Sequence, residues 1–351
     1  TGKTMPNRRD FLKTGTVIAG ASAVAGTDSE LDAKPKSKVK DGSFRDKLLE
    51  GLGGPWPEGG DLKTKLIKTE QKEGYRLEWI TYELEPDDRC PAILLVPDGV
   101  SDKSTAPAVA IWHQHNGQWH LGKTEPAGLA GNPMHHTGVA LAKLGYVVLC
   151  PDALCFEERQ DPEKKLKGSR YERFEFLRYV VAGKCMAWKN ILDMRRAVDY
   201  LVSRPEVKDE RIGCYGHSMG STHTWLIGPW EPRLKALVGN CCLPTYGGIH
   251  RIKILHCFPN FIPGIHAHGD TPDIAGLIAP RALHLNLGEK DRGSPIPEVR
   301  EGVKTIAKAY RKAGAPENFS TFIEPDVGHV LSEKMWDKTK KFFARHLSSD
   351  A

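Results

Sequence analysis

The chain has 351 residues, of which 40% are apolar and 27% charged, and its formal net charge is +6 at pH 7. This supplies enough apolar material for one large globular domain or two small ones. Residues 1–25 carry four basic side chains and one acidic side chain, so +3 of the charge lies there and the rest of the chain is nearly neutral. Because no basic stripe stands out, we expect no nucleic-acid partner.

The first 25 residues are typical of an export signal. The sequence Arg8-Arg9-Asp10-Phe11-Leu12-Lys13 resembles a twin-arginine motif, and a mildly apolar run follows it from Thr16 to Ala25. The run is too short to cross a bilayer about 30 Å thick, so we expect no stable membrane insertion. We predict a signal peptide over 1–25, a linker and N-terminal extension over 26–69, and a periplasmic or extracellular location. A disordered basic tail is the alternative for 1–25.

Strands and helices alternate from residue 70 to residue 351, the range predicted to form the main domain. Alternating apolar side chains predict an antiparallel pair of strands at 75–85 and 90–96. Continuous apolar runs are typical of strands in a sheet that is covered on both faces. Such runs predict further strands at 108–112, 146–150, 211–215, 236–239, 282–287 and 319–323.

The clearest helix spans 185–204, where apolar residues recur at steps of three and four until Pro205 ends the pattern. Weaker helical patterns lie at about 133–144, 221–227, 299–310 and 335–347. Two stretches between the elements, a charged and irregular one at about 153–183 and a His-, Pro- and Gly-rich one at about 243–279, are predicted to be cap-like insertions. The alternation predicts an α/β fold with a mostly parallel, doubly wound sheet, helices on both faces and an antiparallel N-terminal edge.

A Gly-x-Ser-x-Gly motif, Gly216-His-Ser218-Met-Gly220, follows the strand at 211–215 and precedes the helix at 221–227. At a sharp turn from strand to helix, a serine hydroxyl is held out of the sheet, and the two glycines allow the backbones to approach closely. By composition alone the motif would occur about 0.15 times in such a chain by chance, so its position between a strand and a helix matters.

Two further polar residues follow predicted strands, Asp291 after 282–287 and His329 after 319–323. The carboxyl ends of the strands of an open α/β sheet form the ligand crevice, where Ser218, Asp291 and His329 would meet. A neutral His329 can take the proton of Ser218, and Asp291 can orient the imidazole and stabilise its charged form. Asp326 is the alternative acid, but it is only three residues from His329 and too close in sequence to reach the ring from behind.

The oxyanion of an acyl-transfer intermediate needs two hydrogen-bond donors. The backbone N–H of Met219, directly after the serine, is one candidate. We expect the second donor in the loop after the strand at 108–112, at His115. This chemistry requires neither a cofactor nor a metal, and we predict none.

The motifs Gly216–Gly220, Gly288-x-x-Asp291 and Gly328-His329 resemble those of the α/β-hydrolase superfamily. The segments 204–213 and 270–281 resemble its dienelactone hydrolase and acetyl xylan esterase branch of bacterial secreted esterases. The resemblance covers roughly residues 70–347. It implies the α/β-hydrolase fold and ester hydrolysis. Dienelactone hydrolases use a cysteine nucleophile where this chain has Ser218, which argues against dienelactone hydrolase activity.

Several side chains have an alternative interpretation. The pairs His113/His115 and His266/His268, with Asp270, have a spacing that a metal could use. His217 is expected to pack beside the motif and not to act as a second base. Some residues of the insertions and three tryptophans could line a sugar site, although packing is the favoured role. They are Arg159, Tyr171, Phe174, Phe176, Tyr179, Trp119, Trp188 and Trp225.

The chain has eight cysteines. A protein of this size does not need disulfides, and Cys150, Cys214 and Cys241 lie in or beside predicted core strands, where a thiol behaves as a small hydrophobe. We therefore predict cysteines that are mostly free and buried, with a Cys150–Cys155 bridge as the alternative.

Taken together, the patterns predict a serine hydrolase that cleaves small-acyl or carbohydrate esters through an acyl-enzyme. A peptidase related to the prolyl oligopeptidases is the second hypothesis, although the N-terminal region is too short for a propeller domain. A catalytically silent binding protein on the same fold is the third.

Overall fold

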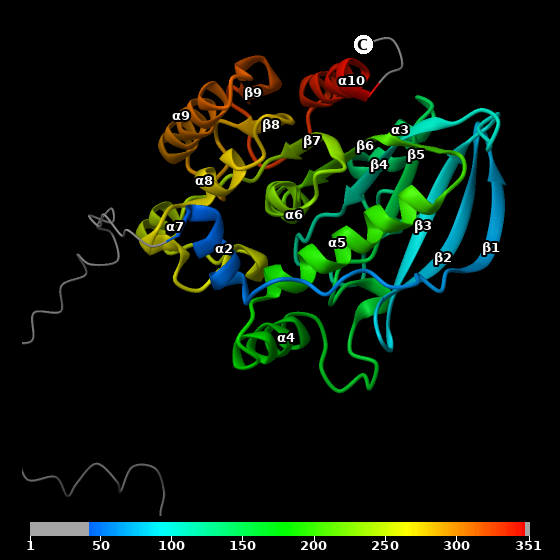
Figure 1. Ribbon diagram of the computed structural model, residues 1–351, viewed down its shortest axis with the longest axis horizontal. Coiled ribbons are helices and arrows are strands. Elements are labelled where there is room, and N and C mark those ends of the chain that lie inside the picture. The colour runs from blue at the N-terminus through cyan, green and yellow to red at the C-terminus, as the bar shows by residue number, and fades with distance from the viewer. Residues whose placement is uncertain (1–41, 348–351) are drawn as a thin grey trace, which may run out of the picture. The chain divides into compact units, whose positions relative to one another are not determined.

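A nine-stranded sheet forms the centre of the computed structural model, which describes residues 42–347 (Figure 1). The strands lie side by side in the order β1-β2-β3-β5-β4-β6-β7-β8-β9. Figure 1 shows the sheet running from β1 and β2, in cyan, to β9, in orange. The strands are β1 (Lys65–Lys72), β2 (Tyr75–Glu85), β3 (Asp88–Pro97), β4 (Ala106–Trp112), β5 (Val147–Pro151), β6 (Val207–His217), β7 (Leu234–Asn240), β8 (Ala282–Gly288) and β9 (Phe319–Glu324).

The strand directions confirm the predicted mostly parallel sheet with an antiparallel N-terminal edge. The pairs β1–β2, β2–β3 and β3–β5 are antiparallel, and every pair from β5–β4 through β8–β9 is parallel. Because parallel strands end at the same edge, the loops after β4, β6, β8 and β9 meet there.

Helices cover both faces of the sheet, as predicted. In β4 the side chains of Ala108, Ala110 and Trp112 join one core cluster, and those of Val109 and Ile111 join the other. The first cluster contains residues of α2, α5, α6, α7, α8 and α9, and the second contains residues of α3 and α10. The helices are α2 (Phe44–Leu52), α3 (Thr137–Ala142), α4 (Ser169–Val181), α5 (Met186–Ser203), α6 (Met219–Ile227), α7 (Tyr246–Ile252), α8 (Thr271–Gly276), α9 (Ile296–Lys312) and α10 (Glu333–Leu347).

Several elements differ from the prediction, among them helices α7 and α8, which lie in the stretch 243–279 where no helix was predicted. The stretch 153–183 is not irregular throughout, because it contains the 13-residue helix α4. Strand β1 was not predicted, since seven of its eight residues are exposed and no apolar alternation marks it. The helix expected at 133–144 is shorter: a 3-10 turn at Pro133–His135 precedes α3.

The N-terminal extension contributes a helix to the folded part of the chain. Helix α2 begins with a capping box between Ser43 and Asp46 and buries Leu48 and Leu52 against the core. The predicted signal peptide and residues 26–41 of the predicted linker and extension lie outside the described residues. Within 42–347, none of the helices has the length and apolar character that crossing a membrane requires.

Candidate active site

Ser218 lies at the turn between β6 and α6, as the motif predicts. Its backbone has φ 58° and ψ −117°, a conformation that a non-glycine residue rarely adopts. A Cβ at Gly216 would lie 2.0 Å from the carbonyl oxygen of Gly220, and one at Gly220 would lie 1.9 Å from that of Trp112. The two glycines therefore allow α6 to start directly against the ends of β4 and β6.

The structure brings Ser218, His329 and Asp291 into one hydrogen-bonded chain. The distance from Ser218 Oγ to His329 Nε2 is 2.8 Å, and the distance from His329 Nδ1 to Asp291 Oδ2 is 2.7 Å. An ionised carboxylate can only accept, so Nδ1–H donates to Asp291, and Nε2 of the neutral ring is left to accept from the serine hydroxyl. This is the arrangement in which the imidazole can take the serine proton.

The loops after β8 and β9 support this chain. A Cβ at Gly288 would lie 2.2 Å from the carbonyl oxygen of Gly328, so glycine is needed for the close approach of the two loops. The carboxylate of Asp291 is 2% exposed, and its second oxygen accepts the N–H of Gly293 at 2.8 Å. The alternative acid, Asp326, is instead 80% exposed and pairs with Lys290 at 2.7 Å.

His217 packs behind His329, with ring centroids 5.2 Å apart. Its Nδ1 accepts a hydrogen bond from the side-chain amide of Asn240 at 2.6 Å, and the same amide nitrogen donates to the carbonyl of Val330 at 3.3 Å. Burial holds the pKa of His217 well below its usual value, so the ring stays neutral. His217 is thus a buried, neutral neighbour of His329, and the predicted packing role agrees with its position.

The two predicted oxyanion donors lie on adjoining segments. Within the described residues, the backbone N–H groups of Met219 and His115 have no hydrogen-bond acceptor. Met219 is the first residue of α6, where N–H groups have no partner inside the helix. The close contact of Gly220 with Trp112 places the loop after β4 against this helix end. The oxyanion role of both donors stays a prediction.

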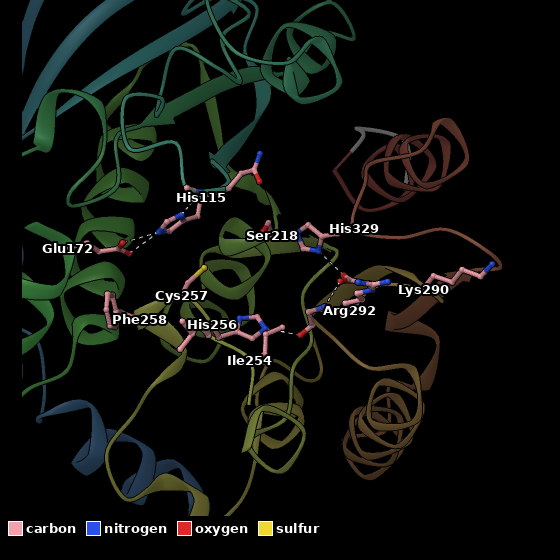
Figure 2. A pocket seen from close by; sticks show the side chains of 15 residues that line it. His115, Glu172, Ser218, Ile254, His256, Cys257, Phe258, Lys290, Arg292 and His329 are labelled. Carbon is pink, nitrogen blue, oxygen red and sulfur yellow. Dashed lines mark hydrogen bonds and ion pairs between the residues drawn. The ribbon is translucent and has the colours of Figure 1, made fainter. Parts of the chain in front are cut away.

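Ser218 and His329 line an open cavity of about 610 Å³. Figure 2 shows His115 and Glu172 on one side of Ser218, and Lys290 and Arg292 on the other. Both predicted insertions line it, the first through α4 and the second through the segment 254–258. The lining residues are His115, Asn116, Gly117, Glu172, Ser218, Ile254, Leu255, His256, Cys257, Phe258, Lys290, Asp291, Arg292, Gly293 and His329.

Glu172 is a site residue that the sequence patterns did not indicate. Its side chain is 4% exposed, yet it lines the cavity and accepts hydrogen bonds from His115 and Trp119. The residue lies in the middle of a charged and aromatic stretch, 57 positions after His115, so no local spacing connects the two. Only the position of α4 above the loop after β4 brings them together.

The structure does not bring the histidines of the metal hypothesis together. His113 Nε2 accepts the backbone N–H of Ala153 at 3.0 Å, and His115 binds Glu172. Within residues 42–347, the group of three possible metal ligands that lie close to one another is Asp152, Glu157 and Glu158. The ammonium of Lys123 bridges these carboxylates at 2.8, 2.7 and 2.7 Å, so it already occupies the position of a cation.

Most side chains with a possible substrate role pack in the interior instead. Trp188 and Trp225 are buried, and their indole N–H groups donate to the backbone of Gly54 and Cys242. Arg159 is buried in ion pairs with Asp193 and Asp88. Of the predicted aromatic run, Tyr171 and Phe176 pack on a small core cluster, Tyr179 is buried, and Phe174 is exposed.

All eight cysteines are free, seven of them buried, which agrees with the favoured prediction. The alternative bridge is absent, because Cys150 and Cys155 are both unpaired thiols. Burial raises the pKa of Cys257, which lines the cavity, to about 12, so this thiol stays protonated and is a poor nucleophile.

Fold and site together define the class of α/β-hydrolases: a mostly parallel sheet, a serine at the elbow after β6, and an acid and a histidine after later strands. A comparison with family models agrees. The model described as Abhydrolase family matches residues 56–340. The chain therefore belongs to this family.

Individual relatives share the whole domain. The protein named "Putative hydrolase YtaP" of Bacillus subtilis (strain 168) is 29% identical over 309 residues, which cover 86% of this chain and 99% of that protein. A glucuronoyl esterase from Solibacter usitatus has a TM-score of 0.62 at 15% identity, covering 86% of this chain and 91% of that one. Acetyl xylan esterase 1 from Thermoanaerobacterium sp. JW/SL YS485 has a TM-score of 0.58 at 14% identity, covering 87% and 93%. At identities this low, the comparison with the two solved structures shows that this chain shares their fold.

Proposed function

We propose that the chain is a serine hydrolase that cleaves carboxylic esters through an acyl-enzyme on Ser218. The hydrogen-bonded chain from Asp291 through His329 to Ser218, opening on a cavity of about 610 Å³, is the observation that carries this proposal. A hydroxyl with a base at 2.8 Å and a buried carboxylate behind that base is the arrangement that activates a serine.

Acylation begins when Ser218 Oγ attacks the ester carbonyl carbon and its proton moves to His329 Nε2. The carbonyl oxygen becomes an oxyanion, which the backbone N–H groups of Met219 and His115 stabilise. Asp291 stabilises the imidazolium that forms. The intermediate then collapses: the bond to the alcohol oxygen breaks, His329 protonates that oxygen, and the alcohol leaves.

Deacylation repeats these steps with water as the nucleophile. His329 takes a proton from the water as the water oxygen attacks the acyl carbon. The second oxyanion collapses, the bond from the acyl carbon to Oγ breaks, and Ser218 receives the proton from His329. The products are the carboxylic acid and the free enzyme.

Small-acyl or carbohydrate esters are the proposed substrates. The cavity is within the range of pockets that hold small ligands, and it is open to solvent, as a group attached to a larger carbohydrate requires. The similar structures with carbohydrate-esterase names, an acetyl xylan esterase and a glucuronoyl esterase, give further support.

The test measures hydrolysis of p-nitrophenyl acetate, acetylated xylan and short peptide amides by the purified chain and by Ser218→Ala. We expect ester hydrolysis by the wild type and a loss of about 10⁴-fold or more in the variant. Faster cleavage of the peptides would favour a peptidase. A folded wild type that hydrolyses no ester would favour the silent binding protein, and full activity in the variant would refute the assignment of Ser218.

We further propose that the chain is exported, because residues 8–13 resemble a twin-arginine motif. The test replaces Arg8 and Arg9 by lysine in the expressed precursor. Retention of the variant in the cytoplasm is the expected result, and unchanged export would contradict the proposal.

A further inference from the structure

We infer that Glu172, on the insertion helix α4, is a positioning residue that holds the His115 backbone N–H in place for the oxyanion. The inference rests on the proposed function, because an oxyanion forms only if the site performs acyl transfer. It assigns to the insertion a part in the chemical step, in addition to covering the cavity.

The hydrogen bonds of the Glu172 carboxylate are all with side chains of the loop after β4. Its two carboxylate oxygens lie 3.1 and 3.0 Å from His115 Nε2, and the indole N–H of Trp119 donates to the second oxygen at 2.8 Å. The His115 side chain is 14% exposed and that of Glu172 is 4% exposed. A carboxylate this buried needs hydrogen-bond donors, and the loop supplies them from two of its side chains.

Both ring nitrogens of His115 are occupied. Nδ1 accepts the backbone N–H of Gly117 at 2.9 Å, so Nε2 carries the hydrogen that points to Glu172. The ring is therefore fixed from two sides and is not available as a second general base. The rings of Trp119 and Phe156 also pack edge-on against it, at 5.1 and 5.0 Å between centroids. What remains for catalysis is the backbone N–H of His115.

The side chain of the other proposed oxyanion donor, Met219, belongs to an apolar cluster against which the same helix packs. The Met219 side chain belongs to a small core cluster with Cys155, Phe156 and Met186. Tyr171 and Phe176 of α4 pack against this cluster, as does Trp119. Helix α4 is thus linked to Met219 through packing on a shared apolar cluster, and to His115 through the hydrogen bonds of Glu172, which Figure 2 shows. These two links set the spacing of the two N–H groups, on which stabilisation of the oxyanion depends.

A displaced donor affects the transition state more than substrate binding, because the negative oxygen exists only after attack. Glu172→Ala is therefore expected to lower kcat roughly 10- to 100-fold, with KM changed by less than about threefold. Glu172→Gln can keep an acceptor oxygen at the position that faces both His115 and Trp119, with its N–H₂ group turned toward His115 alone, and we expect a smaller loss of kcat.

Glu175 provides the matched control. It is a buried glutamate on the same helix, one turn further on, but it pairs with Arg178 and does not line the cavity. The variants Glu175→Gln and Glu175→Ala remove the same charge from α4 without touching the loop after β4. We expect their kcat to stay within about twofold of the wild type.

The test compares these four variants in kcat, KM and the inhibition constant of a trifluoromethyl ketone, whose adduct on serine carries an oxyanion. Circular dichroism melting checks that each variant folds. If Glu172→Ala does not fold, Trp119→Phe, which removes one donor to Glu172 and keeps a packing ring, takes its place. The inference predicts that ketone affinity falls by the same factor as kcat in the Glu172 variants only.

The inference is overturned if the Glu172 and Glu175 variants lose kcat equally. It is also overturned if only KM changes and the ketone affinity stays the same. In both cases the esterase proposal stands. Ser218→Ala, assayed in parallel, reports on the proposed function itself. If that variant keeps the activity, the nucleophile is wrong and the role of Glu172 fails with it.

Discussion

Ser218 shows how a single backbone conformation exposes the proposed nucleophile. A φ of 58° at a non-glycine residue costs about 1–3 kcal/mol and persists only where the surroundings enforce it. The surroundings here are the two flanking glycines and the backbone N–H of Ser218, which donates to the carbonyl of Asn240 at 2.8 Å. These local requirements are visible in the sequence, which is why Ser218, Asp291 and His329 could be placed at strand ends before the structure. Glu172 could not, because its partners come from a distant loop.

Asp291→Asn tests whether Asp291 is the acid that orients His329. The amide can donate to His329 Nδ1 and so favours the tautomer that cannot accept the serine proton. We expect kcat to fall by about 10³- to 10⁴-fold with little change in stability. The matched control is Asp326→Asn, which removes an exposed ion pair and should leave kcat within about twofold. The opposite ranking of the two variants would make Asp326 the acid.

The two insertions are the elements that the sequence described least well. Their helices are held by contacts with distant segments, such as Glu172 with His115, and their apolar periodicity is weak. Strand β1 was missed for a related reason, since a strand at the edge of a sheet with exposed faces has no buried side to mark it. The central strands β4 to β9 were predicted because burial on both faces demands continuous apolar runs.

An ion cluster around the buried Lys123 side chain joins the loop after β4 to residues 152–158 at the start of the first insertion. The Lys123 ammonium contacts Asp152, Glu157 and Glu158, and its side chain is 2% exposed. Removing the cation leaves carboxylates close to one another without compensation.

We expect Lys123→Met to lower the free energy of unfolding by about 3–5 kcal/mol in urea denaturation. Lys340→Met, which breaks a surface pair with Asp337, should cost less than about 1 kcal/mol. Equal costs would show that the cluster does not stabilise the fold.

For the whole molecule, buried histidines link stability to pH. Burial lowers the pKa of His223 to about 3 and holds that of His217 well below its usual range. Both stay neutral in the folded chain, whereas the unfolded chain binds protons once the pH falls below about 6.5. The contribution of these residues to stability is therefore complete above about pH 6.5 and is lost as the pH falls from there toward the folded pKa.

We expect each of the two histidines to remove about 1 kcal/mol of stability between pH 7 and pH 5.5. Urea denaturation at the two pH values measures the loss of unfolding free energy. His223→Gln should reduce this loss by about 1 kcal/mol. His120→Gln, at an exposed position, should leave it unchanged. A loss of the same size in wild type and His223→Gln would contradict the buried, neutral state of His223.

Covalent labelling tests whether Ser218 is a nucleophile activated by His329 and Asp291. A fluorophosphonate is incubated with the folded wild type, Ser218→Ala and Asp291→Asn, and the adduct is located by peptide mass spectrometry. We expect one adduct per chain, on Ser218, which is absent in Ser218→Ala and forms much more slowly in Asp291→Asn. A folded wild type without an adduct, or an adduct on another residue, would contradict the assignment of Ser218 as the nucleophile.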